Sequence, residues 1–470
     1  MRRRTGLVHF VGVGGIGMSG IAEVCLNLGF KVRGSDLKAS EVTRRLSELG
    51  VDLREGHDAR NVEGADVVVI SSAVRSDNPE LLGARAAKIP VIKRAEMLAE
   101  LMRMKYAIAI AGTHGKTTTT SLVATVLSEA HLDPTVVVGG KLNQTGTNAK
   151  LGQSDYLVAE ADESDGSFLS LFPTIALVSN VDPEHLDHYQ HGMSDIVDAF
   201  LGFVSRVPFY GLAVLCIDHP VVRELSARIE RRVVTYGLSS GANVRATDIV
   251  FDGPRTSFEV FVRGASVGRF DLPMLGEHNV RNALGAIAIA DELGVDVDVT
   301  RRALSSFMGV DRRFSVRGRV DRVRGLAADV MVVDDYGHHP EEIRATLLGA
   351  GTGYPGRRIL VGFQPHRYTR TRDLMDGFVT AFPGASRVVL APIYSAGEDP
   401  IEGVSSEVLR ARLEARGVSV DLVGSVDALA ETLAQNASGD DLVVIFGAGD
   451  VARASKLVLA SLIGPRAVSA

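Results

Sequence analysis

The chain of 470 residues is 46% hydrophobic and 23% charged, a composition typical of globular proteins with several cores. Its net charge of -6 argues against a nucleic-acid surface, because such surfaces are basic. The sequence has no run of about 18 apolar residues to span a membrane, and the apolar stretch behind its basic N-terminus is too short for a signal peptide, so we expect a cytoplasmic protein without membrane insertion.

Strands and helices alternate from the first apolar stretch onward. Strands are expected at residues 7–13, 31–34 and 66–70, and helices from about residue 15 and near residues 41–49. This alternation predicts a parallel sheet with right-handed crossovers. A charged helix at residues 94–103 ends the first expected domain, residues 1–103.

The first strand runs into a glycine turn formed by Gly12, Gly14 and Gly17. Turns of this pattern bind a pyrophosphate at the start of the following helix. Asp36 ends the second strand, where such folds meet a ribose hydroxyl. Dinucleotides and nucleotide sugars both suit the pattern, and the same glycines also serve close packing of helix on strand in proteins that bind nothing there.

An apolar strand then runs into a second glycine turn. Gly112 and Gly115 let successive backbone N–H groups point at one anion, and the following helix adds its partial positive charge. Lys116 can reach the β- and γ-phosphates while Thr117 holds Mg²⁺. The general pattern has a glycine where Ile110 stands, so this is a variant phosphate loop. The alternative is a tight turn with a solvated lysine.

Polar residues follow the next two buried strands, expected at residues 155–160 and 174–179. Glu160 ends the first of them, and a carboxylate beside a phosphate loop suits Mg²⁺. Glu163 and Asp165 are expected either to bind substrate or to be solvated. His185 is a candidate ligand of a second metal ion, although a lone histidine is usually structural.

The remaining pattern predicts the end of a central domain, residues 104–314, and a third domain, residues 315–470. Short alternating stretches at residues 243–272 predict an antiparallel flank, and a long amphipathic helix follows at residues 279–293. Strands are expected in the third domain at residues 329–333, 358–362, 387–390 and 441–446. Cys25 and Cys216 lie in apolar contexts and are expected to be reduced thiols.

Three polar clusters lie at expected strand or helix ends in this second half: residues 276–282, 334–340 and 363–370. The last contains His366, Arg367 and Arg370, and the arginine fork suits a carboxylate or a phosphate. Each cluster by itself is equally compatible with a surface loop.

Taken together, these segments resemble the Mur ligase family. The matching segments are residues 9–20, 34–36, 71–80, 112–118, 160–165, 334–340 and 364–372. Such long matches in the same order are specific, and this family uses the shortened phosphate loop. The resemblance implies three α/β domains: a Rossmann-like N-terminal domain for a UDP-sugar, a central ATPase domain with an antiparallel flank, and a Rossmann-like C-terminal domain for an amino acid.

The resemblance also implies an activity: ATP drives the joining of L-alanine to the lactyl carboxylate of UDP-N-acetylmuramate through an acyl phosphate, in peptidoglycan precursor synthesis. Several sibling branches use a carbamylated lysine in the central domain, and that device is unavailable here because no lysine lies between Lys150 and Lys456. The alanine-adding branch fits, and so does the branch that recycles murein tripeptide. Residues 14–20 favour the former.

The resemblance further assigns roles residue by residue. The residues implied to bind ATP are Gly112, Thr113, His114, Gly115, Lys116, Thr117, Thr118, Asn279, Asn282, Arg313 and Asp335. Those implied to bind two Mg²⁺ ions are Thr117, Glu160 and His185. The UDP part falls to Gly12, Gly14, Gly15, Gly17, Asp36, Ser71, Ser72 and Arg75. Alanine and the muramoyl carboxylate fall to Tyr336, His338, His366, Arg367 and Arg370. Lys116, His338, Arg367 and Arg370 are the expected catalytic residues.

Two other classes of protein stay open on the residues alone. An NAD-dependent oxidoreductase explains the first glycine turn and Asp36 but leaves the phosphate loop unexplained. The other is a non-catalytic regulator, which would bind a nucleotide and sense cell-wall precursors without catalysing a reaction. The sequence does not decide between a monomer and a homodimer.

Overall fold

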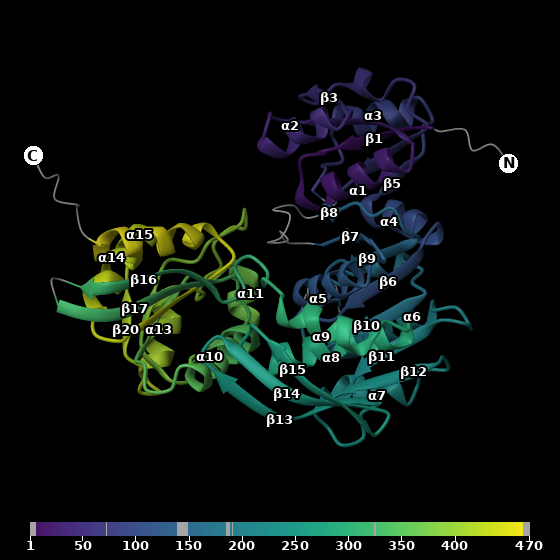
Figure 1. Ribbon diagram of the computed structural model, residues 1–470. Helices are drawn as coiled ribbons and strands as arrows, with labels where there is room; N and C mark the ends of the chain where they lie inside the picture. The colour runs from purple at the N-terminus through teal and green to yellow at the C-terminus, as the bar shows by residue number, and fades with distance from the viewer. Residues whose placement is uncertain are drawn as a thin grey trace, which may run out of the picture. The chain divides into compact units, whose positions relative to one another are not determined.

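The computed structural model describes residues 6–71, 73–138, 149–184, 189, 191–323 and 326–463 (Figure 1). The chain divides into two compact units. Unit 1 holds the chain up to Asp248 together with Phe258–Asp271 and Val280–Met308, and unit 2 holds Ile249–Ser257, Leu272–Asn279 and the chain from Gly309 on. Three sheets, of five, ten and six strands, carry the fold, in agreement with the predicted α/β class.

The first sheet is fully parallel, with the strand order β3-β2-β1-β4-β5. Its strands are β1 (Leu7–Val11), β2 (Lys31–Asp36), β3 (Asp52–Glu55), β4 (Val67–Ile70) and β5 (Val91–Lys93), and its helices are α1 (Ile16–Asn27), α2 (Glu41–Glu48), η1 (Ala59–Val62), α3 (Pro79–Ala86) and α4 (Arg94–Arg103). The order reverses beside β1, and ligands of open parallel sheets bind at such a reversal. The first glycine turn begins there, directly after Val11.

The second sheet has the order β15-β14-β13-β12-β11-β10-β6-β9-β7-β8. Its strands are β6 (Tyr106–Ala111), β7 (Thr135–Val137), β8 (Ala149–Lys150), β9 (Tyr156–Glu160), β10 (Ile175–Val178), β11 (Leu212–Cys216), β12 (Val233–Gly237), β13 (Val244–Asp252), β14 (Arg255–Val262) and β15 (Ala265–Leu272). The accompanying helices are α5 (Lys116–Glu129), η2 (Ser167–Ser170), α6 (Met193–Ser205), α7 (Pro220–Ser226), α8 (Glu277–Glu292) and α9 (Val297–Ser305).

At the middle of this sheet β6 pairs in parallel with β9 on one side and β10 on the other. The carboxyl ends of these three strands therefore share one edge, and the polar residues that follow them meet there. Two-residue turns join β13 to β14 and β14 to β15, so these neighbours run antiparallel, as the predicted flank requires. At the second turn Arg263 (φ 49°) and Gly264 (φ 84°) both have the positive φ of a type I′ turn.

One continuous apolar core joins the first two sheets. It includes Phe10 of β1, Leu101 of α4 and Ala109 of β6, all with no exposed surface. Helix α4 contacts β4 and β5 of the first sheet (Figure 1). It also contacts β6 of the second sheet and the short helix η2 that accompanies that sheet. Helix α4 is thus shared by both sheets of unit 1, and its residues face both.

The third sheet belongs to unit 2 and has the order β16-β17-β21-β18-β19-β20. Its strands are β16 (Ser315–Val323), β17 (Leu326–Asp335), β18 (Ile359–Phe363), β19 (Ala385–Leu390), β20 (Val420–Leu422) and β21 (Leu442–Phe446). Only β16 is antiparallel, and one apolar cluster covers each face of the sheet. The helices are α10 (Pro340–Gly353), α11 (Tyr368–Asp373), α12 (Met375–Phe378), α13 (Ser406–Glu414), α14 (Val426–Asn436), η3 (Asp450–Arg453) and α15 (Ala454–Ile463).

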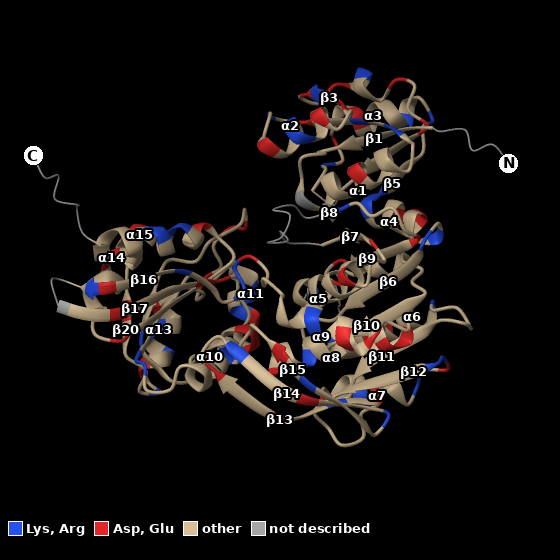
Figure 2. Cartoon of the chain, in the orientation of Figure 1, with Lys and Arg blue, Asp and Glu red and all other residues tan. Residues whose placement is uncertain are grey.

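Both predicted thiols, Cys25 and Cys216, are buried and free, and burial raises the pKa of each, to about 12 and about 11. Acidic and basic residues are interspersed in both units (Figure 2). Among the described residues, no helix combines the length and the apolar character needed to cross a bilayer.

A buried polar network crosses the first sheet. The Glu80 carboxylate on α3 lies 3.0 Å from His9 Nε2 on β1, and it accepts hydrogen bonds from Ser35 Oγ on β2 at 2.7 Å and from Asn61 Nδ2 at 2.6 Å. Burial opposes the charged form, but hydrogen bonds from His9, Ser35 and Asn61 lower the pKa of Glu80 to about 2. Its contribution to stability is therefore complete above pH 4.5 and is lost as the pH falls toward 2.

We predict that Glu80→Ala lowers the free energy of unfolding at pH 7 by about 3–5 kcal/mol, because the buried His9 and Ser35 and the half-buried Asn61 lose their acceptor. The midpoint of the first transition in a urea titration measures the loss. Glu55→Ala on the exposed side of β3 is the control and should leave that midpoint in place. An unchanged midpoint for Glu80→Ala would show that the network contributes nothing.

Candidate active site

The second glycine turn closes β6 onto α5. Gly112 has φ 137° and Gly115 has φ 80°, both in the region that favours glycine. A Cβ at Gly112 would collide with Ser179 Oγ and would also lie 3.2 Å from the Asn180 backbone N, and a Cβ at Gly115 would lie 2.7 Å from Asn282 Oδ1. The loop therefore requires glycine at both positions, and α5 begins with Lys116 directly after it.

The segment after β10 holds this loop in shape. Asn180 Oδ1 accepts from His114 N at 2.7 Å, and Asn180 Nδ2 donates to the His114 carbonyl oxygen at 3.0 Å. Ser179 Oγ donates to the same carbonyl at 2.9 Å, and Thr113 Oγ1 accepts from Asp182 N at 2.8 Å. Bonds from a neighbouring strand end thus fix the loop backbone before any ligand arrives.

Lys116 lies across the loop and pairs with a buried carboxylate. Its Nζ donates to Glu163 Oε2 at 2.7 Å and Oε1 at 2.9 Å, and to the carbonyl oxygen of Gly112 at 2.6 Å. Burial favours the neutral amine, but the surrounding carboxylates, above all Glu163, raise the pKa of Lys116. The lysine therefore stays charged. Glu163 is 3% exposed, so the expectation of a solvated side chain is wrong for it, whereas Asp165 is exposed and accepts from Ser167 N.

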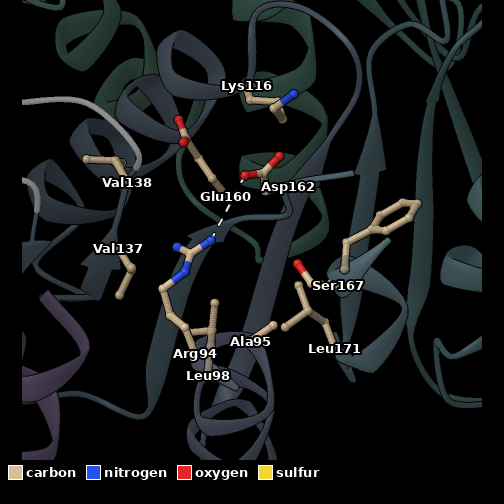
Figure 3. Close-up of a pocket in the computed structure, with 11 residues that line it drawn as sticks. Arg94, Ala95, Leu98, Lys116, Val137, Val138, Glu160, Asp162, Ser167 and Leu171 are labelled. Carbon is tan, nitrogen blue, oxygen red and sulfur yellow. Dashed lines mark ion pairs between the residues drawn. The ribbon is translucent and has the colours of Figure 1, made fainter. Parts of the chain in front are cut away.

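A pocket of about 140 Å³ lies beside the loop (Figure 3). Lys116, Glu160, Asp162, Arg94 and Ser167 supply its polar lining. Its apolar lining is Ala95, Leu98, Val137, Val138, Phe168 and Leu171. The structure thus brings together two residues predicted from the sequence, Lys116 and Glu160, and adds Arg94, which had no expected role.

Other predicted nucleotide residues lie around the same loop. Thr117 and Thr118 follow Lys116 in the first turn of α5. Asn282 on α8 accepts a hydrogen bond from Thr119 Oγ1 at 3.2 Å, and Asn279, one turn earlier, donates to the Leu275 carbonyl oxygen at 2.7 Å. Residues 112–118 and Asn282 therefore form one cluster in unit 1.

Histidines and an aspartate lie next to the loop on its β10 side. Asp182 Oδ1 lies 3.2 Å from His219 Nε2, and Asp182 Oδ2 lies 3.6 Å from His114 Nε2. His185, the candidate ligand of a second ion, lies outside the described residues, so its metal-binding role stays a prediction.

The first glycine turn is held by the strand next to it. Asp36 Oδ2 accepts from Gly14 N at 2.8 Å, and the Ser35 carbonyl oxygen accepts from Gly12 N at 2.9 Å. Gly15 is the N-cap of α1, and Gly17 lies in its first turn. The turn is thus preformed by Asp36, which binds backbone here. Ser71 follows β4, Ser72 lies outside the described residues, and Arg75 pairs with Asp77 on the surface.

A second polar cluster lies in unit 2, at the carboxyl end of β17. Burial raises the pKa of Asp335 to about 6, although its carboxylate accepts from Phe314 N at 2.8 Å and Gly337 N at 2.7 Å. Arg313 pairs with Glu342 at 3.0 Å, and its guanidinium carbon lies 5.7 Å from the centre of the Tyr336 ring. The predicted residues Arg313, Asp335 and Tyr336 therefore meet.

Aromatic rings continue this cluster to the end of β18. The His338 ring lies 5.2 Å from Tyr336 and 5.8 Å from His366, and His366 stacks on Tyr394 at 5.5 Å and 13°. Arg370 Nη1 donates to His366 Nδ1 at 3.3 Å, so the neutral imidazole carries its proton on Nε2. Arg367, between them in sequence, has φ 70°, a strained backbone of the kind found at functional sites.

The sequence missed several of these contacts. In the sequence, Asn180 and Glu163 are only members of polar segments, because the residues they hydrogen-bond, His114 and Lys116, lie in another segment of the chain. Arg94 was read as part of a charged helix, and Tyr394 was not singled out. A polar residue one or two positions after a buried strand is the pattern that could have identified such residues. Of Asn180, Glu163, Arg94 and Tyr394, only Asn180 fits it.

Family models match nearly the whole chain. The model described as Mur ligase family, catalytic domain, matches residues 7–106, the Mur ligase middle domain matches residues 110–290, and the Mur ligase, glutamate ligase domain, matches residues 318–449. The chain belongs to the Mur ligase family, and the three-domain α/β fold class expected from the sequence is confirmed.

Similar proteins point to one branch of that family. The UDP-N-acetylmuramate--L-alanine ligase of Anaeromyxobacter sp. (strain Fw109-5) is 56% identical over 98% of this chain and 99% of its own, and that of Geobacter sulfurreducens is 55% identical over 97% of each. The crystal structure of UDP-N-acetylmuramate-alanine ligase from Thermotoga maritima matches with a TM-score of 0.78 at 30% identity, covering 97% of this chain and 98% of that one. A murein peptide ligase from Psychrobacter arcticus matches with 0.68 at 25% identity, with the same coverage.

We predict that His366 stays neutral down to mildly acidic pH. Burial, followed by the charges of His338, Arg370 and Arg367, lowers the pKa of His366 from 6.5 to about 4. The unfolded chain takes up this proton first, so the contribution of His366 to stability falls as the pH drops from 6.5 toward 4. NMR titration of labelled histidines, with His366→Gln to identify the signal, measures the midpoint. A midpoint at or above 6.5 would contradict this environment.

Proposed function

We propose that this chain is an ATP-dependent ligase that joins L-alanine to the lactyl carboxylate of UDP-N-acetylmuramate and releases ADP and phosphate, in the cytoplasmic synthesis of peptidoglycan precursors. The observation that carries the proposal is the preformed phosphate loop whose Lys116 shares a pocket with Glu160. Full-length similarity to proteins named for this activity supports the choice of substrates. The oxidoreductase and regulator alternatives are dropped, because neither accounts for membership of a ligase family.

A carboxylate does not acylate an amine directly, because its oxide is a poor leaving group, so it must first be activated. The lactyl carboxylate attacks the γ-phosphorus of ATP, ADP leaves, and an acyl phosphate forms. The alanine amine then attacks the acyl carbon, and phosphate leaves from the tetrahedral intermediate. Two anions meet in the first step, so charge neutralisation and positioning supply most of the catalysis. Lys116 provides a fixed positive charge at the loop, and its hydrogen bonds to Glu163 must give way to phosphate oxygens.

The residues beside the loop suit Mg²⁺. A half-buried carboxylate, Glu160, and the hydroxyl of Thr117 are the hard oxygen donors that this ion prefers. A bound Mg²⁺ would neutralise the phosphate charge that Lys116 leaves uncompensated. A second ion at His185 rests on the family resemblance alone.

In unit 2 the proposal gives the alanine and the muramoyl carboxylate to the cluster around His366. Its Nε2–H is a donor, Arg367 and Arg370 supply forked cations, and Tyr336 and His338 supply ring faces. Arg313 and Asp335 on the same cluster are assigned to the nucleotide, with Asn279 and Asn282 on α8. Gly12, Gly14, Gly15, Gly17, Asp36, Ser71, Ser72 and Arg75 are assigned to the UDP part. Domain boundaries near residues 103 and 314 belong to the same proposal.

We predict amide formation when the protein is incubated with ATP, UDP-N-acetylmuramate and L-alanine, with one phosphate released per amide formed. Mass spectrometry of the nucleotide product and a phosphate assay measure the two amounts. The matched reaction replaces alanine by the murein tripeptide L-alanyl-γ-D-glutamyl-meso-diaminopimelate. Faster turnover of the tripeptide than of alanine would move the chain to the recycling branch, and phosphate release without any amide would refute ligation.

We predict that Lys116→Ala abolishes the release of ADP that substrates elicit, because the charge facing the γ-phosphate is lost. Binding of UDP-N-acetylmuramate, measured by calorimetry, should stay within about twofold of wild type, since interactions at separate sites add independently. Lys456→Ala on the exposed face of α15 is the control for loss of a lysine. Equal loss of catalysis and of UDP-sugar binding would count against two separate sites.

A further inference from the structure

Arg94, the first residue of α4, places its guanidinium in the pocket beside the phosphate loop (Figure 3). Its Nη2 lies 4.0 Å from Asp162 Oδ2, beyond hydrogen-bonding distance. Within the part of the chain that the structure describes, the guanidinium makes no hydrogen bond to protein. The side chain is one-third exposed, so N–H donors on the open side of the guanidinium can meet a ligand.

Lys116 in the same pocket is in a different state. Its ammonium group is 2.7 Å from Glu163 and also donates to two loop carbonyl oxygens. The two cations of the pocket are thus unequal: one is fully engaged by protein, and the other has only a distant partner. An incoming anion meets less competition at Arg94 than at Lys116.

The guanidinium of Arg94 also lies against the first glycine turn. A Cβ added at Gly17 would collide with Arg94 Nη1 and would lie 3.2 Å from Arg94 Cδ. Gly17 is in the first turn of α1, where backbone N–H groups and the helix dipole favour anions. Arg94 therefore lies between the glycine turn of the first sheet and the phosphate loop of the second.

The size and lining of the pocket limit what Arg94 can take there. About 140 Å³ is well below the roughly 300–1,000 Å³ of pockets that enclose whole ligands, so it accepts one group of a larger molecule. Leu98, Phe168 and Leu171 form an apolar wall that water solvates poorly. A charge-assisted bond from Arg94 is strengthened in such surroundings.

We propose that Arg94 is a binding residue for the sugar nucleotide, donating through its fork to an anionic oxygen group, either the pyrophosphate or the lactyl carboxylate. This rests on the proposed function, in which the UDP-sugar binds at the first glycine turn and its carboxylate meets the γ-phosphate of ATP at the phosphate loop. Asp162 keeps the guanidinium in the pocket until the substrate replaces it. The competing interpretation is a surface ion pair with Asp162, which typically contributes under about 1 kcal/mol to stability and nothing to binding.

The test uses Arg94→Ala and Arg94→Lys in the full chain. The matched control is Arg103→Ala, at the other end of α4, where the side chain pairs with Glu100 on the surface. Calorimetry measures the affinity for UDP-N-acetylmuramate, UDP-N-acetylglucosamine, UDP and ATP. We expect Arg94→Ala to weaken UDP-N-acetylmuramate binding roughly 10- to 100-fold, the range of a charge-assisted hydrogen bond, with ATP affinity unchanged. Arg94→Lys should fall between, because it keeps the charge and loses the fork.

The three uridine ligands separate the two sources of the anion. Equal weakening for all three supports contact with the pyrophosphate, whereas weakening for UDP-N-acetylmuramate alone supports contact with the carboxylate. Wild-type affinities in a folded Arg94→Ala protein, or the same loss in Arg103→Ala, would overturn the role of Arg94 while leaving ligation by the wild type intact. A wild-type protein that binds no uridine ligand and forms no amide would instead overturn the proposed function together with this role.

Discussion

The backbone curl between β6 and α5 is the constraint on which the rest of the site depends. Its two glycines are required by positive φ and by the close approach of Ser179 and Asn282. The loop cannot relax, because the Asn180 side chain both donates to and accepts from the His114 peptide groups. A cradle of backbone N–H groups that is already formed adds no ordering cost when an anion binds, and this is the physical advantage of building such a site from a strand, a turn and a helix.

Charge balance in the unliganded site follows from the same geometry. Lys116 is mostly removed from water, and an unpaired cation there is costly, so the buried Glu163 compensates it from the loop after β9. A triphosphate brings more negative charge than Glu163 supplies and cannot share the ammonium fully with it. Ligand binding at the loop therefore requires Glu163 to shift its interactions, either toward a cation that accompanies the nucleotide or toward protonation. Burial already raises the pKa of Glu163, which favours protonation if no cation takes the place of Lys116.

Much of this fold could be predicted from the sequence, but the failures have more than one cause, since the buried inner strand β11 was not predicted either. Buried apolar strands such as β6, β10 and β21 were found because both faces of a parallel strand are covered. Strands β3 and β16 were missed because they lie at sheet edges and are rich in charged residues. The phosphate loop was found because its chemistry is local in sequence. The pairing of Lys116 with Glu163 and the contact of Arg94 with Gly17 were missed because they join segments far apart in the chain.

Helix α4 shows why those long-range contacts matter. It follows the last strand of the first sheet, yet its apolar side belongs to a core that continues into the second sheet. A packed core resists relative sliding of its parts, since any shift opens cavities whose cost rises with their volume. The first glycine turn, Arg94 and the phosphate loop are therefore held at fixed separations within unit 1. A substrate that bridges the two turns therefore has to match a distance that the packed core of unit 1 sets.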